Sequence, residues 1–314
     1  MEQRTNSTLF EKEAVSTAVI KLSVPTIISS LVMVIYNLAD TYFVGLLDDP
    51  VQTAAVTLAA PALLAFNAIN NLFGVGTSSA MSRLLGRGET EKVKECSAFG
   101  FYCALFCAGI FFVLTWIFLN PLVGLMGADA DNFAATCAYM KWAVAFGAIP
   151  SILNVVFAYL VRSEGNSMHA SIGTMSGCIL NMILDPFFIL PMGLNMGAAG
   201  AGLATFLSNC VACLYFLVLL YIKRRRTCVC IDIRRFSFQK SIIADIFGVG
   251  IPASIQNLLN VTGMTVFNNF ATAYGSEVVA AMGIVQKIQM VPLQITLGAT
   301  QGIMPFVGYN FASG

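Results

Sequence analysis

The sequence predicts an all-α protein that crosses a membrane several times. Apolar residues make up 57% of the 314 residues and charged residues only 11%, whereas soluble domains carry roughly 25% charged residues. The mean hydropathy is +0.79. The apolar residues gather in long stretches, each reaching the ~20 residues that a helix needs to cross a bilayer. Because these stretches lack the alternation of a membrane β-barrel, we expect a polytopic helical bundle.

Eight membrane helices are expected, in order along the chain and joined by short polar loops. They are predicted at residues 18–39, 53–82, 96–119, 133–161, 167–190, 198–222, 242–273 and 278–311. The first 13 residues are polar and charged, so no cleavable signal peptide is expected and the first apolar stretch itself directs insertion.

The second part of the chain repeats the beginning of the first. Pro25 and Pro252 lie 227 positions apart, and Gly76 and Gly302 lie 226 positions apart. A nearly constant offset across apolar helices is typical of membrane transporters built from internal repeats.

The repeat predicts the domain organisation. We expect a six-helix N-terminal lobe at 1–222, a basic cytoplasmic linker at 223–241, and the first two helices of a second lobe at 242–314. The sequence would then hold eight of about twelve membrane helices, truncated at its C-terminal side.

Positive charge is sorted to one side of the predicted membrane. Fifteen of the 17 Lys and Arg residues lie in the N-terminal segment or in the loops after the second, fourth and sixth stretches. The positive-inside rule therefore predicts a cytoplasmic N-terminus. The run Lys223–Arg226 is interpreted as a topology signal between the two halves, with lipid or nucleic-acid binding as the alternative.

Two acidic residues lie deep in predicted membrane helices. Asp40 is near the end of the first helix, and Asp185 precedes Pro186 late in the fifth. A charge at such depth costs ~3 kcal/mol or more and indicates function. Asn181 and Asp185 share one helix face, and Asp40 beside them would complete a site for a proton or Na⁺. The alternatives are an interfacial cap for Asp40 and a helix-end role for Asp185.

Two further residues are candidates in the helices. Pro25 lies fifteen residues before Asp40, and a proline there removes a backbone hydrogen bond and predicts a hinge. Phe267 and Asn268 occupy the positions that match Asp40 in the second half, so the acid site is confined to the first. Lys287 either lines the substrate path or snorkels toward the surface.

Several motifs together resemble one transporter family. The motifs are Tyr36-Asn37-Leu38-Ala39-Asp40, Arg162-Ser163-Glu164-Gly165, Leu180 to Pro186, Gly200 to Thr205, and Gln301-Gly302 through Asn310. They are similar to those of the multidrug and toxic compound extrusion (MATE) exporters, nearest to the bacterial DinF/MepA-like branch.

The resemblance implies a two-lobe bundle of six-helix repeats around a central cavity. It implies a secondary active efflux transporter, not an enzyme, that antiports organic, mostly cationic and amphipathic compounds against H⁺ or Na⁺. The expected setting is the bacterial inner membrane, with a monomer that meets lipids, drugs or toxic metabolites, no nucleic acid, and no cofactor beyond the coupling ion. The implied cation-binding residues are Asp40, Asn181, Asp185 and Thr205, with Tyr36 and Tyr139 in the supporting network and Asn154 on the substrate path.

Two alternatives remain at this point. A flippase for a lipid-linked anionic precursor would favour several basic residues in the cavity, for which only Lys287 is a candidate. A membrane enzyme would need a catalytic cluster such as HExxH or DDxxD, and the sequence contains neither.

Overall fold

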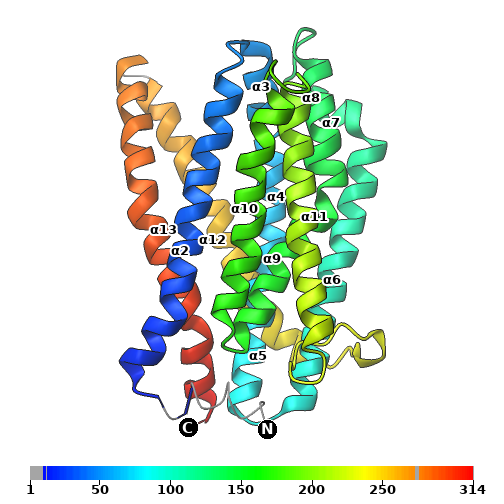
Figure 1. Cartoon of the computed structure of the whole chain (residues 1–314), viewed down its shortest axis with the longest axis vertical. Coiled ribbons are helices and arrows are strands. Elements are labelled where there is room, and N and C mark those ends of the chain that lie inside the picture. Colours follow the sequence, from blue (N-terminus) through cyan, green and yellow to red (C-terminus); the bar gives the residue numbers. More distant parts are fainter. Residues whose placement is uncertain (1–9, 12, 273–275, 314) are drawn as a thin grey trace.

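A computed structural model describes residues 10–11, 13–272 and 276–313, without the side chains of 261, 264, 265, 267–269, 271, 272, 276–284 and 287. Throughout this part of the chain the regular structure is helical, with no strand. The long helices run side by side along one axis, and α12 and α13 lie on one flank of the bundle, next to α2 (Figure 1). The all-α prediction is confirmed.

The helices of the first 222 residues follow the predicted order. They are α2 (Val15–Gly45), α3 (Pro50–Leu58), α4 (Ala60–Ile69), the π-helix η1 (Asn70–Val75), α5 (Gly76–Gly86), α6 (Thr90–Ile117), α7 (Leu119–Leu125), α8 (Phe133–Met140), the π-helix η2 (Lys141–Phe146), α9 (Ala148–Ser163), α10 (Ser167–Ile189) and α11 (Ala198–Ile222). A short 3-10 helix, η3 (Ile233–Arg235), precedes the long helices α12 (Lys240–Thr272) and α13 (Ser276–Ser313).

Two of the predicted membrane helices contain irregular turns. The second stretch consists of α3, α4, η1 and α5, and Pro61 near the start of α4 marks one break. The fourth stretch consists of α8, η2 and α9 and bends by 44° between Phe146 and Ala148. At the bend, a Cβ on Gly147 would collide with the carbonyl of Ala143, so glycine permits this geometry. The second stretch nevertheless forms one 37-residue helical span, Pro50–Gly86, whereas the fourth is a bent pair of helices. The π-turns in both were not predicted.

The described helices are long and apolar enough to place the chain in a membrane. Six helical spans of the described residues can each cross a bilayer by length and composition, counting α3 to α5 as one, and the bent α8–α9 segment brings the number to seven. The sequence predicted eight, of which the 38-residue α13 does not enter this count. The loops after α5, α9 and α11 share one end of the bundle, called the basic end below, which is the lower end in Figure 1.

The helices α12 and α13 pack closely on the rest of the bundle. A Cβ on Gly302 of α13 would lie 2.7 Å from the Leu22 carbonyl of α2, so glycine allows the two backbones to approach. Polar contacts join α12 to α4 and α5. Ser254 of α12 donates to the Ala68 carbonyl of α4 (2.7 Å), and Asp245 of α12 pairs with Arg83 of α5 (3.3 Å). This packing brings α13 against the proline-containing part of α2.

Candidate functional site

A polar cluster lies inside the bundle where α2, α8, α10 and α11 meet. Its centre is Asp185 on α10, which is fully buried, and Asn181, one turn earlier and 2% exposed. Both side chains point to the same side of α10 because they are four residues apart. The helix continues through Pro186 to Ile189, so Asp185 is an interior residue and the helix-end interpretation was wrong.

The Asn181 amide joins Asp185 to α11. In the orientation that satisfies all its groups, Nδ2 donates to the two oxygens of the Asp185 carboxylate at 2.8 and 3.2 Å. Its Oδ1 then accepts from Oγ1 and the backbone N–H of Thr205, at 3.3 and 3.1 Å. A buried amide with its donors and acceptors used in this way fixes the direction of the carboxylate.

Asp40 faces the same cluster from α2. It interacts electrostatically with Asp185, Tyr36 and Tyr139, and Tyr36 is hydrogen-bonded to Thr205. Asp40 lies within α2, five residues before its last residue Gly45, so the cap interpretation was wrong. Its Oδ1 is buried and has no hydrogen-bond partner in the described part of the chain, which leaves one acceptor oxygen open inside the site.

A chain of amides extends the cluster toward the middle of α9. Asn154 on α9, 7% exposed, donates to the Asn209 side chain (3.2 Å), and Asn209 in turn donates to the Thr205 carbonyl (2.9 Å). Asn209 was not among the predicted residues. It lies four residues after Thr205, and the same i, i+4 spacing that linked Asn181 to Asp185 would have identified it.

The remaining predicted residues either lie away from the cluster or have side chains outside the part of the chain that the structure describes. Pro25 is inside the continuous helix α2, and its role as a hinge stays a prediction. The side chain of Lys287, and the side chains of Phe267 and Asn268, lie outside the described residues. The structure therefore brings together Asp40, Tyr36, Tyr139, Asn181, Asp185 and Thr205, with Asn154 connected to them through Asn209.

The donor set of the cluster is made of oxygens and amides. Across the described residues there is no group of three or more His, Cys, Asp or Glu side chains that would hold a metal ion such as Zn²⁺. Two carboxylates, two phenols, an amide and a hydroxyl suit a proton or a hard monovalent cation. Two neighbouring carboxylates repel each other when both are charged in a site without water. Binding one positive charge therefore reduces their electrostatic repulsion.

The turn after α9 is a second buried polar feature of the bundle. Arg162 was expected in a basic loop, but it lies in the last turn of α9 and is only 4% exposed. Its guanidinium donates to the Gln301 side chain of α13 (3.2 Å) and lies 5.5 Å from the centre of the Tyr159 ring. Arg162 thus links α9 to α13 without a carboxylate partner among the described residues.

Glu164 holds the other side of the same turn. Its carboxylate is 5% exposed and accepts from the Thr227 hydroxyl (2.7 and 2.9 Å) and from the backbone N–H groups of Cys228 and Val229. Glu164 lies just outside the membrane-spanning segment, and burial raises its pKa above 4.5, although these hydrogen bonds and nearby Lys223 oppose the shift. The turn therefore anchors the linker that leads to α12.

Comparisons with known proteins identify the family of the chain. The MatE family model matches residues 25–199, more than half of the chain. The chain is 34% identical over 306 residues to the multidrug export protein MepA of Staphylococcus saprophyticus, covering 97% of this chain and 66% of that protein. MepA of Staphylococcus aureus is also 34% identical, over 304 residues. The chain thus spans slightly under two thirds of the length of these relatives.

Solved structures show the same fold. A MATE protein in complex with MaD3S superposes with a TM-score of 0.91 at 29% identity, covering 98% of this chain and 68% of the other. The outward-facing conformation of a multidrug resistance MATE transporter of the MOP superfamily gives 0.88 at 31% identity, covering 94% and 64%. On the sequence match and the shared fold, the chain belongs to the MatE family, as its motifs predicted.

Proposed function

We propose that the whole protein is a cation-coupled exporter of small organic, mostly cationic and amphipathic compounds. Its relatives are multidrug export proteins by name. The proposed setting is the bacterial cytoplasmic membrane, with a monomer whose N-terminus and basic end lie in the cytoplasm. In this proposal residues 1–222 form the first lobe, 223–241 the linker, and 242–314 the beginning of the second lobe.

The observation that carries the proposal is the buried cluster around Asp185. Its carboxylate is fully buried, interacts with Asp40, and is held by Asn181. A pair of acids inside a membrane bundle is costly to maintain, and a purely structural role would be served better by apolar packing. Reversible binding of H⁺ or Na⁺ gives the pair a function.

The proposed mechanism couples this binding to a movement of α2. A cation that enters from outside neutralises the acid pair, α2 bends at Pro25, and the first-lobe cavity shrinks so that cargo leaves. Tyr36 and Asp40 are carried by α2 itself, whereas Asp185 is on α10, so a charge change between them acts directly on the α2–α10 contact. This contact also includes the Ser29–Thr174 hydrogen bond (2.7 Å).

The energy available sets the scale of the export. One H⁺ that moves down ~100 mV supplies ~2.3 kcal/mol. A tenfold concentration gradient costs ~1.4 kcal/mol, so one proton supports a gradient of roughly fiftyfold.

The test is export of a fluorescent cationic dye from cells that express the whole protein. We expect the Asp185→Asn variant to lose at least nine tenths of coupled export while it still inserts, because the neutral amide neither takes up a proton nor supplies the negative charge that attracts Na⁺. The matched control is Asp129→Asn, which changes an exposed acid in the loop before α8 and should leave export unchanged. Dye export by Asp185→Asn at the wild-type rate would overturn the proposal, and absence of dye export by the wild type would favour the lipid-precursor flippase.

A further inference from the structure

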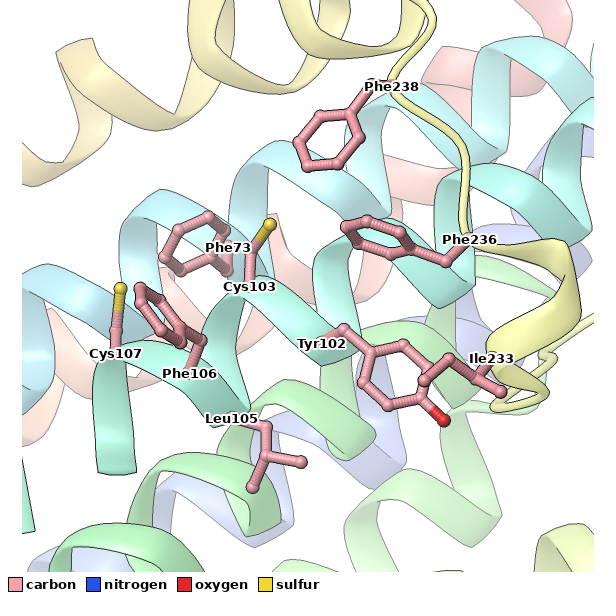
Figure 2. Close-up of a pocket in the computed structure, with 9 residues that line it drawn as sticks. All are labelled: Phe73, Tyr102, Cys103, Leu105, Phe106, Cys107, Ile233, Phe236 and Phe238. Carbon is pink, nitrogen blue, oxygen red and sulfur yellow. The ribbon is translucent and has the colours of Figure 1, made fainter. Parts of the chain in front are cut away.

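A second site lies at the basic end of the bundle, on the outside of α6. A pocket of about 700 Å³ opens between α6, Phe73 of η1 and the linker segment that contains η3. Figure 2 shows Cys107, Phe106 and Cys103 of α6 on the left of the pocket, Phe236 of the linker to their right and Phe238 of the linker above. The polar cluster of the bundle interior contributes no residue to this pocket.

The pocket wall offers nothing to a polar ligand. The only oxygen among the lining side chains is the Tyr102 hydroxyl, which already donates to the Ile231 carbonyl (2.9 Å). A polar ligand would leave its own groups without partners here, at a cost of a few kcal/mol for each group. The wall therefore fits a hydrocarbon.

The linker side of the pocket is held in place by contacts with α6. The Phe236 ring stacks on Phe99 at 5.6 Å and meets Tyr102 edge-on at 5.9 Å. Ser97 both accepts from the Cys230 N–H (3.1 Å) and donates to its carbonyl (3.3 Å). The pocket is thus a preformed part of the fold, since the linker is tied to the helix over several residues.

The pocket continues into the membrane-facing surface of α6. Phe106, at the pocket, is 69% exposed, and Ile110, Val113 and Ile117 are exposed farther along the helix. Their spacing of four, three and four residues places them on one face. In a membrane-spanning helix such a face contacts lipid tails, so the pocket is the inner end of a surface already covered by hydrocarbon.

Positive charge flanks the linker part of the pocket. Arg234 follows the lining residue Ile233, and Lys240 comes two positions after Phe238. Both side chains are exposed and form no ion pair with the described residues, whereas Arg235 pairs with Glu91. The nearby acid Glu95 accepts from Gln239 (2.8 Å), and Asp232 caps the backbone of Arg234 (3.0 Å). Two exposed cations next in sequence to residues that line an apolar pocket complement a phosphate group.

We propose that this pocket binds one membrane phospholipid, with an acyl chain between α6 and the linker and its phosphate beside Arg234 and Lys240. The chain fills the apolar volume, and the phosphate remains at the level of the basic end. This lipid site is independent of the proposed export cargo. The bound lipid would cover the exposed apolar side chains of the linker. It would also stabilise the contact between the linker and α6.

Native mass spectrometry of the purified protein, titrated with dioleoylphosphatidylglycerol, tests the acyl-chain part. We expect one tightly bound lipid in the wild type and at least tenfold weaker binding by Cys103→Trp, whose ring fills the pocket. The matched control Ile110→Trp lies on the same face of α6 outside the pocket and should bind as the wild type does. Equal binding by Cys103→Trp, equal loss in Ile110→Trp, or no retained lipid in the wild type would overturn the proposal.

The same titration tests the phosphate part with a charge-matched pair of variants. Arg234→Ala/Lys240→Ala should bind the lipid at least tenfold more weakly. Arg224→Ala/Arg225→Ala removes two charges from the same linker without touching the pocket and should bind normally. Equal weakening in both double variants would contradict a placed phosphate and indicate nonspecific attraction.

Thiol labelling of the unmodified protein provides a readout that does not depend on the folding of any variant. Cys103 and Cys107 line the pocket, whereas Cys137 lies on α8. Removing lipid should speed maleimide labelling of the two pocket thiols at least fivefold, adding the phospholipid back should reverse this, and Cys137 should not respond. Unchanged labelling at Cys103 and Cys107 would reject an acyl chain in the pocket.

Discussion

At the scale of single residues, Asn181 of α10 connects the Asp185 carboxylate to Thr205 of α11. It donates to the buried Asp185 carboxylate and accepts from Thr205. Asp40, in contrast, keeps one buried oxygen without a partner among the described residues. The two carboxylates therefore differ: one is positioned by a fixed amide, and the other has a free acceptor that faces the site.

Replacement of Asn181 by leucine should uncouple the site without removing an acid. The Asp185 carboxylate would lose its side-chain donor inside the protein, which costs ~1–3 kcal/mol of stability. We expect dye export to fall at least tenfold and the melting temperature to fall measurably. The control Asn37→Leu changes an exposed amide that donates only to the Met33 carbonyl of its own helix. Comparable losses in the two variants would show that Asn181 has no special role.

The buried Glu164 carboxylate should make the folding stability of the protein depend on pH. Its pKa is raised by burial, so the folded protein binds this proton more tightly than the unfolded chain does. The stabilisation is complete below about pH 4.5, the ordinary pKa, and is lost as the pH rises through the folded value. Relative to Glu164→Gln, the wild type should therefore lose melting temperature as the pH rises above 4.5.

Glu89 provides a control, because its contribution to stability should change with pH in the opposite direction. Its pKa is lowered by the hydrogen bond from Lys92, so its contribution is present above the ordinary pKa and lost as the pH falls. Melting temperatures of Glu164→Gln, Glu89→Gln and the wild type at several pH values check both signs. A wild type whose melting temperature rises relative to that of Glu164→Gln as the pH increases would refute the account of Glu164.

At the scale of helices, the packing of α13 on α2 depends on small residues. A Cβ on Gly302 would lie 2.7 Å from the Leu22 carbonyl and 2.8 Å from the Ser23 Cα, both backbone atoms that cannot turn aside. The Gly302→Ala variant should therefore lose ~1–3 kcal/mol of stability through forced separation of the helices. At Gly248 of α12 nothing lies within 4 Å of an added Cβ, so Gly248→Ala is the matched control. Thermal unfolding of both variants in detergent checks this, and equal stability of the two would contradict the packing.

How far the sequence predicts these elements depends on the range of the interactions. The apolar stretches located the helices well, and α11 has the predicted bounds of 198 and 222. The proximity of Asn181 and Asp185 followed from local i, i+4 spacing. The π-turns η1 and η2 were not predicted, because a hydropathy pattern does not report a local change in the spacing of backbone hydrogen bonds. The contacts of Arg162 and Glu164 span 139 and 63 residues of sequence, and no local pattern encodes them.

At the scale of the whole molecule, the contacts of α12 and α13 gather toward the basic end and the middle of the bundle. They include the Arg83–Asp245 pair, the Arg162–Gln301 hydrogen bond and the Ser254–Ala68 hydrogen bond. In the proposed transport cycle these contacts close the cytoplasmic side and separate when the cargo path opens inward. The acid cluster lies on the α2–α10 contact, and α2 also packs against α13, so one helix connects cation binding to this closure.

The most direct test of the central claim is transport in proteoliposomes under one imposed gradient at a time. The whole protein is reconstituted, a pH gradient or a Na⁺ gradient is applied, and uptake of a cationic dye is followed. We predict that one of the two gradients drives uptake by the wild type and that the Asp40→Asn/Asp185→Asn variant shows no driven uptake. Uptake by the variant at the wild-type rate, or no response of the wild type to either gradient, would contradict cation coupling through the acid cluster.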